Sequence, residues 1–295
     1  MHYLKRIFDF IIFSNVFVSF CAASLVFATK IILQLKGDFY LEFFVFFSSL
    51  AVYNFQRITF PETEVFVFLS IRHKWTLANS KLLFLLTVFS LIISVLIFLF
   101  CFTNKTGSAI LLLPFAFISI WYALDLHRVF PFLKNKFKRL RLVPYLKIGL
   151  IALTWTAITV WLPIIEYRLN LLSDQTFILT LERLLFIFAI TLPFDIRDML
   201  QDKAFQLKTI PLALGIERTK YLSYFTLLIF SLIAFSRVPL LSTDIKIVGA
   251  LVVSALIASI LISIINENKR EYYYSFWIES LMVIQFLLLF FSTIN

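Results

Sequence analysis

Three aspartates near the end of one apolar segment have the spacing in this chain that most directly suggests chemistry. Asp195, Asp198 and Asp202 close a run of apolar residues. On a helix with 3.6 residues per turn they lie within about 60° of one another. Carboxylates held this close repel each other unless a cation lies between them, and Mg²⁺ prefers such oxygens together with phosphate oxygens. The spacing predicts a Mg²⁺ site, although the same acids can instead pair with bases at a solvated helix end (Arg197, Lys203, Lys208).

The residues that follow these aspartates have the composition of an ordered turn. Pro211 ends a helix and Gly215 permits a tight backbone. From the start of this turn, Lys208 can reach a phosphate bound next to a metal ion. The sequence therefore places a possible phosphate ligand close to the predicted metal site.

Other kinds of catalytic site find no support in the sequence. The three histidines are scattered, and both cysteines lie in apolar runs. Neither a glycine-rich phosphate loop nor the residue order of a serine hydrolase or a zinc protease occurs. Hydrolase and zinc chemistry are excluded on these grounds.

The elements that must position the aspartates are membrane helices. The chain has 295 residues, of which 61% are hydrophobic and 15% charged, whereas soluble domains carry about 25% charged residues. A soluble enzyme is therefore excluded, and nine helices of ~20 apolar residues would use most of the chain. We expect one all-α transmembrane domain over 1–295, with nine helices at about 8–29, 39–57, 82–102, 107–124, 145–165, 177–201, 221–236, 245–265 and 273–292. The seventh of these is short and could be tilted or broken.

The basic residues are distributed unequally between the two sides of this expected bundle. Of the 27 lysines and arginines, 20 fall in the N-terminus or in the loops after the second, fourth, sixth and eighth segments. The positive-inside rule then predicts a cytoplasmic N-terminus, with the C-terminus across the cell (inner) membrane. The net charge of +10 needs no nucleic-acid partner. Because the longest polar loops lie on the cytoplasmic side, any chemistry is expected at that end.

The pattern D-x-x-D-x-x-x-D followed by K-T-x-P-x-x-x-G resembles the second aspartate-rich motif of the UbiA-type intramembrane prenyltransferases. The resemblance runs from the end of the second segment through the seventh. It implies nine helices around a central cavity, and transfer of a prenyl group from a prenyl diphosphate to a lipophilic acceptor. It also implies that Asp198 and Asp202 bind Mg²⁺ with help from Asp195, and that no catalytic residue exists apart from the metal and diphosphate ligands.

The first aspartate-rich motif of that family, N-x-x-x-D-x-x-x-D, is altered in this chain. Asn54 matches its asparagine, but Ile58 stands at the first aspartate position and Glu62 at the last. One carboxylate of the implied two-metal cluster is therefore missing. Arg57 can compensate by holding diphosphate oxygens directly, or it can serve only as a positive-inside anchor.

The loop after the fourth segment ends in R-x-x-P-x-x-K, which is similar to the corresponding loop of the family. Lys147 is its strongest candidate, because it lies at a helix start. The loop's basic residues would equally suit anionic membrane lipid. The resemblance thus implies diphosphate ligands at Asn54, Arg57, Arg141, Lys147 and Lys208, with Tyr122, Tyr145 and Glu62 as further candidates.

Two other functions remain open from the sequence. The altered first motif is compatible with a catalytically weak or inactive relative that binds an isoprenoid or lipid phosphate without transferring it. A small transporter is a third class, but no related halves are visible and the acids lie at one end of a segment. The sequence does not identify the acceptor or the prenyl length.

Overall fold

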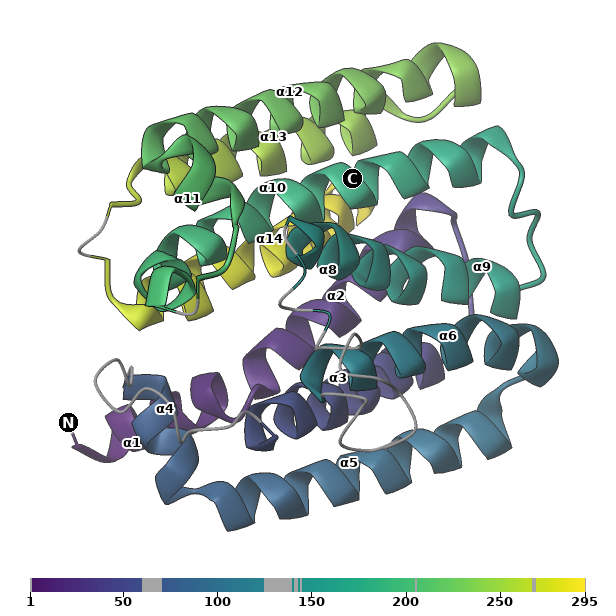
Figure 1. The fold of residues 1–295 in the computed structure, drawn as a ribbon. Coiled ribbons are helices and arrows are strands. Elements are labelled where there is room, and N and C mark those ends of the chain that lie inside the picture. The colour runs from purple at the N-terminus through teal and green to yellow at the C-terminus, as the bar shows by residue number, and fades with distance from the viewer. Residues whose placement is uncertain are drawn as a thin grey trace.

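The computed structural model describes residues 2–59, 71–124, 140, 143, 145–204, 206–266 and 269–294, and these form helices without any strand. Figure 1 shows them as one bundle, with α12 and α13 along one side, α5 along the other, and α2, α8, α10 and α14 between. The elements are α1 (His2–Phe13), α2 (Val16–Ile32), α3 (Tyr40–Ile58), α4 (Ile71–Ala78), α5 (Ser80–Cys101), α6 (Lys105–Ala123), α8 (Leu146–Thr156), η3 (Ala157–Trp161), α9 (Leu162–Glu166), α10 (Asp174–Ala204), α11 (Ile210–Leu214), α12 (Ile216–Leu241), α13 (Ile245–Ser263), η4 (Tyr273–Ile278) and α14 (Glu279–Ile294).

The helices confirm the all-α membrane architecture, while the count of nine is approximate. In the described residues, seven helices are long and apolar enough to cross a membrane, and α1 with α2 adds an eighth if that pair is one span. The remaining predicted segment is α3, a 19-residue helix that contains Glu42 and Arg57. This chain is thus a multi-pass membrane protein.

Two of the predicted segments differ from the observed helices. The seventh is neither short nor broken, because α12 runs continuously over 26 residues with Pro239 in its last turn. The first is not one straight helix, because α1 and α2 meet at 57°. At the bend, Asn15 adopts the left-handed conformation with φ 63°, which asparagine tolerates better than most residues.

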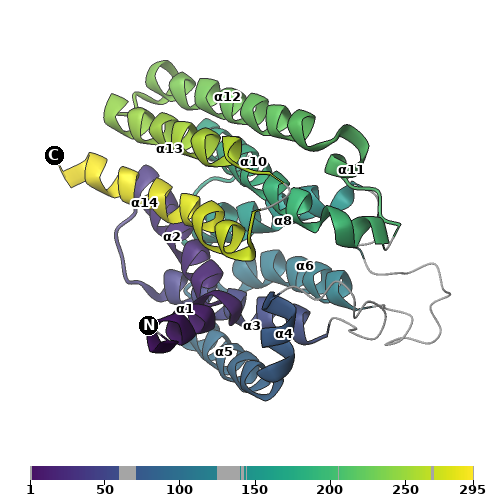
Figure 2. The same cartoon turned by 90° about the vertical axis from the view of Figure 1, so that its left-hand side faces the viewer.

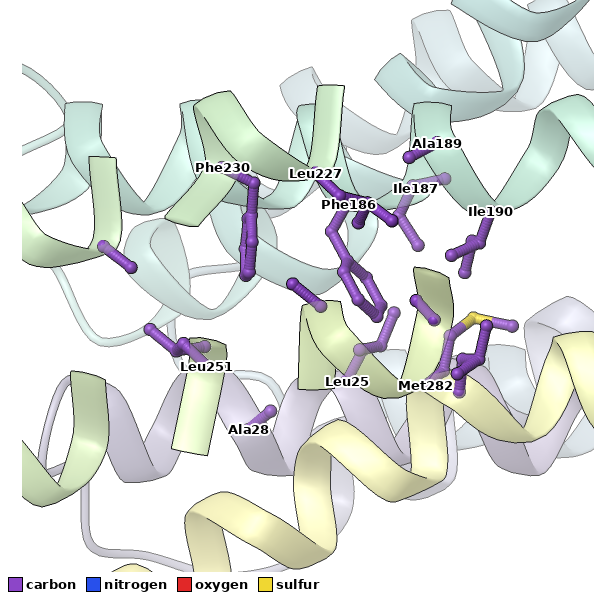
Figure 3. Close-up of a cluster of buried hydrophobic side chains, with 14 of the residues drawn as sticks. Leu25, Ala28, Phe186, Ile187, Ala189, Ile190, Leu227, Phe230, Leu251 and Met282 are labelled. Carbon is purple, nitrogen blue, oxygen red and sulfur yellow. The ribbon is translucent and has the colours of Figure 1, made fainter. Parts of the chain in front are cut away.

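α10 lies at the centre of the packing. Its side chains Phe186, Ile187 and Ile190 meet Leu25 of α2 and Met282 of α14 in a buried cluster that also contains residues of α12 and α13 (Figure 3). Membrane helices gain stability mainly from close packing of this kind, because lipid is as apolar as the core. The helix that carries the three aspartates is therefore held on several sides.

A buried ion pair joins α10 to α12 away from those aspartates. Arg237 donates from Nε and Nη2 to the two carboxylate oxygens of Glu182, each at 2.6 Å. Both side chains are almost fully inaccessible, at 1% and 2% exposure. The neighbouring Arg183 donates to Gln285 of α14 at 3.0 Å and to Thr29 of α2 at 3.3 Å. These contacts tie four helices together inside the bundle.

Candidate functional site

A charged cavity of about 390 Å³ lies at the end of α10 where the aspartates are. Helices α2, α3, α4, α6, α8, α10 and α14 all contribute to its lining. Figure 2, which turns the bundle by 90°, shows the short helix α4 beside α1 at this end. We call this space the headgroup cavity; its charged lining residues are Arg57, Arg72, Lys147, Asp195, Arg197, Asp198, Glu271 and Glu279.

The three predicted aspartates do come together, and they do so around a lysine. The ammonium of Lys147, at the start of α8, lies 2.7 Å from Asp195 Oδ1, 3.6 Å from Asp198 Oδ2 and 4.0 Å from Asp202 Oδ2. Asp195 and Asp202 are buried, and Asp198 is partly exposed to the cavity. The prediction that these residues share one helix face and need a cation is consistent with this geometry. The cation that they surround is a side chain of the same protein.

This arrangement does not fit the predicted magnesium ion as it stands. Mg²⁺ needs carboxylate and phosphate oxygens at about 2.0–2.1 Å in octahedral geometry, and the space between the aspartates is taken by Lys147. Within the described part of the chain, no group of three or more acidic, histidine or cysteine side chains is arranged to hold a metal. Lys147 thus lies where a cation shared by Asp195 and Asp198 would be expected, and the magnesium site stays a prediction.

Three arginines also line the cavity, and one of them, Arg197, lies on α10 beside the aspartates. Arg197 binds Asp198 through Nε at 2.8 Å and Nη2 at 3.2 Å, and its Nη1 lies 3.0 Å from Glu271 Oε1. Arg72 of α4 lies 3.5 Å from the same Glu271 oxygen. Arg57, at the end of α3, lines the cavity as well, and it has no carboxylate within 4.0 Å among the described residues.

Burial and the nearby arginines shift the pKa values of two groups that line this cavity. Burial, followed by the charges of Arg57 and Arg72, lowers the pKa of His73 to about 4. Burial alone would raise the pKa of Glu271, but Arg197 and Arg72 outweigh it, so that its pKa is lowered. At Glu271 the two arginines thus favour the charged carboxylate, and at His73 burial together with Arg57 and Arg72 disfavours the protonated ring.

Asn54 does not line the headgroup cavity. Its side chain is fully buried, and its Oδ1 accepts a hydrogen bond of 2.7 Å from Nδ2 of Asn15. Asn15 Oδ1 in turn accepts a hydrogen bond of 2.6 Å from Nη2 of Arg72. The matching motif residue therefore contacts the bend between α1 and α2 and positions Arg72 through it.

Only one of the other predicted ligands in the described part of the chain lines the headgroup cavity. Tyr122 lines the headgroup cavity. Lys208 and Tyr145 instead line a small pocket behind Lys147, where the backbone N–H of Tyr145 donates to the carbonyl of Lys208 at 3.1 Å. Arg141 and Glu62 lie outside the described residues. Arg72, His73, Glu271 and Glu279 were not selected from the sequence. Arg72 and His73 fall in the expected loop between 57 and 82, Glu271 just before the last expected segment and Glu279 within it.

A second, largely apolar cavity of about 360 Å³ adjoins the first. It lies among α3, α5, α6 and α8, and we call it the apolar cavity. At the boundary, the indole N–H of Trp155 donates to the hydroxyl of Tyr53 at 3.0 Å. The lining residues that the two cavities share are Tyr53, Gln56, Tyr122, Ile151 and Trp155.

Comparisons with known proteins identify the fold. No family model and no curated protein sequence matches this chain. Among solved structures, a UbiA homolog from Archaeoglobus fulgidus bound to GPP and Mg²⁺ aligns with a TM-score of 0.64 at 12% identity, over 97% of this chain and 100% of its own. A digeranylgeranylglyceryl phosphate synthase aligns with a TM-score of 0.57 at 16% identity, over 99% of both chains. This protein has the fold of the UbiA-type intramembrane prenyltransferases.

Proposed function

We propose that this chain is a membrane-embedded prenyltransferase-like protein that binds a prenyl diphosphate and transfers its prenyl group to a lipophilic acceptor. The observation that carries the proposal is the pair of adjoining cavities, one charged and one apolar, which share five lining residues. A prenyl diphosphate has the same division into an anionic end and a hydrocarbon chain. The fold shared with proteins of this class supports the same conclusion.

The chemistry that this arrangement suits is ionisation of the carbon–oxygen bond of the prenyl diphosphate. The diphosphate leaves with the electron pair, the acceptor's nucleophile bonds to the resulting allylic carbon, and the acceptor gives up a proton. Cationic side chains aimed at the leaving group stabilise the charge that develops there. Tyr53 and Trp155 lie where the two cavities meet, so their rings can stabilise a nearby carbocation.

Magnesium enters this proposal as a prediction from the sequence. When bound, Mg²⁺ would neutralise the leaving diphosphate, and Asp198 and Asp202, with Asp195 beside them, are the residues that would hold it. The Archaeoglobus homolog binds GPP together with Mg²⁺. The ion pairs of all three aspartates with Lys147 argue against a Mg²⁺ ion at this place.

A second candidate function is binding of a prenyl diphosphate without transfer. Two observations favour it specifically: Ile58 replaces a motif aspartate, and Lys147 rather than an open site lies at the centre of the acidic group. Purified protein incubated in detergent with labelled GPP, Mg²⁺ and a membrane lipid extract separates the two. A labelled lipid product supports transfer, and binding without product supports the second candidate. If GPP does not bind at all, both candidate functions are contradicted.

The proposal includes an orientation with the headgroup cavity at the cytoplasmic side. Cys101 ends α5 and is exposed, whereas Cys21 is buried. With a cytoplasmic N-terminus, Cys101 lies on the outer side. A membrane-impermeant thiol reagent should therefore label Cys101 in intact cells, and a Cys101→Ser variant should abolish the labelling. Labelling only after the cells are opened would reverse the orientation.

A further inference from the structure

We infer that the headgroup cavity binds its diphosphate through guanidinium groups and without a divalent cation, with Lys147 neutralising the aspartates that would otherwise ligate a metal. The inference rests on the proposed function and specifies how the site recognises its ligand. It names Arg57, Arg72 and Arg197 as the groups that face the phosphates. Arg72 and Arg197 were not among the ligands that the sequence suggested.

The first step of the argument is that the acidic half of the cavity already has its cation. Lys147 approaches all three aspartates, at 2.7, 3.6 and 4.0 Å. Arg197 adds a two-point contact to Asp198. An ammonium and a guanidinium thus supply the positive charge that closely spaced carboxylates require. The aspartates have no need of a metal ion to stay together.

The second step is that three guanidinium groups, of Arg57, Arg72 and Arg197, line the same cavity. Arg72 and Arg197 share the carboxylate of Glu271, and Glu279 also lines the cavity. Arg57 has no carboxylate within 4.0 Å among the described residues. Holding like charges together beside a cavity is unfavourable without an anion. An anionic ligand between these guanidiniums would relieve the repulsion.

The third step concerns the place of Arg57 in the altered motif. It directly precedes Ile58, which stands where the related motif has a metal-binding aspartate. A carboxylate can contact a diphosphate only through a metal ion, whereas a guanidinium donates two parallel hydrogen bonds to phosphate oxygens directly. Isoleucine at position 58 and arginine at position 57 are therefore both compatible with direct binding of a diphosphate without a metal ion. Asn54 supports it through Asn15, which orients Arg72.

The test measures binding of labelled GPP to the purified full chain in detergent, once with Mg²⁺ and once with EDTA. Equilibrium dialysis gives the affinity, and the shift of the unfolding temperature gives an independent reading. We expect the two affinities to agree within about threefold, since the direct charged hydrogen bonds supply the binding energy. Inorganic diphosphate should compete in EDTA. Binding that appears only with Mg²⁺ would overturn the inference and leave the proposed function standing.

Variants test the residues that carry the inference. Arg57→Gln should weaken GPP binding about tenfold or more in EDTA, because hydrogen bonds to charged groups contribute about 1.5–3 kcal/mol. Lys74→Gln, which removes an exposed charge from α4, is the matched control and should change nothing. An unchanged affinity of Arg57→Gln would contradict the inference.

The acidic half gives the sharpest contrast with metal-dependent binding. With Mg²⁺ present, an Asp198→Asn/Asp202→Asn double variant should still bind GPP, because neither carboxylate has to hold a metal ion for the guanidinium groups to bind the diphosphate. Its unfolding temperature, measured in parallel, shows whether it is folded. Loss of binding by the folded variant would restore the metal-dependent mode. Failure of the wild-type protein to bind GPP in either buffer would overturn the proposed function and this inference together.

Discussion

α10 carries two groups of charged residues whose surroundings differ in kind. Glu182 and Asp195 are 13 residues apart, which is about 20 Å along a helix. Glu182 has one partner, Arg237, in a closed two-point contact that excludes water. The aspartates at the other end share Lys147 and Arg197 and lie beside a cavity that Arg57, Arg72, Glu271 and Glu279 also line. The enclosed pair leaves no room for a ligand, whereas several charged groups beside a cavity can bind one.

Removing Arg237 should have the largest effect on stability. Arg237→Met leaves the Glu182 carboxylate unpaired inside the bundle, which costs about 3–5 kcal/mol for a buried pair. The free energy of unfolding, measured in detergent, should fall by this amount. Arg218→Met, which removes an exposed arginine from the same helix, should leave it unchanged, and the Glu182→Gln/Arg237→Met double variant should regain most of the lost stability. If Arg237→Met is as stable as the wild type, the two groups on α10 do not differ as described.

Removing Lys147 should have a smaller but more informative effect. Lys147→Met leaves three aspartates facing one another, and the loss of charged contacts corresponds to about 1.5–3 kcal/mol. Mg²⁺ should then raise the unfolding temperature of this variant more than that of the wild type, because the carboxylates are now open to a metal. Lys203→Met, at an exposed position of α10, provides the control. An equal response of both proteins to Mg²⁺ would show that Lys147 does not take the place of a cation.

The smallest expected effect concerns the pH dependence of stability. The pKa of His73 is about 4 in the folded protein and about 6.5 in an unfolded chain. Below pH 6.5 the unfolded state therefore takes up a proton that the folded state does not, so stability falls as the pH falls toward 4. His73→Gln should lose less stability than the wild type between pH 7 and pH 5. Equal losses would mean that burial and the two arginines, Arg57 and Arg72, do not lower the pKa of His73 in the folded protein.

The sequence predicts the architecture well because its signals are local. Runs of apolar residues mark the helices, and the 3- and 4-residue spacing of Asp195, Asp198 and Asp202 places them on one face whatever surrounds them. The fold likeness to UbiA-type structures confirms the resemblance that the second motif suggested. The helices and the shared helix face can therefore be predicted without knowing how distant segments pack.

The site itself was only partly predictable, because its contacts join distant segments. Lys147 was selected for its place at a helix start, but its contact with the aspartates depends on how α8 packs on α10. Arg72 and Glu271 are 199 positions apart and meet only in the folded bundle. The family motif places Asn54 among the diphosphate ligands. In the structure its side chain instead accepts a hydrogen bond from Asn15, whose left-handed conformation within an apolar run has no signal in the sequence.

The bend at Asn15 links the backbone of the first segment to the position of Arg72. Its one amide fixes two partners on two different helices, accepting from Arg72 and donating to Asn54. A residue there that restored a straight first segment would also release the arginine, although it lies outside the lining of the headgroup cavity. If Arg72 binds a diphosphate as we propose, a substitution of Asn15 should change the affinity without altering any residue that lines the cavity.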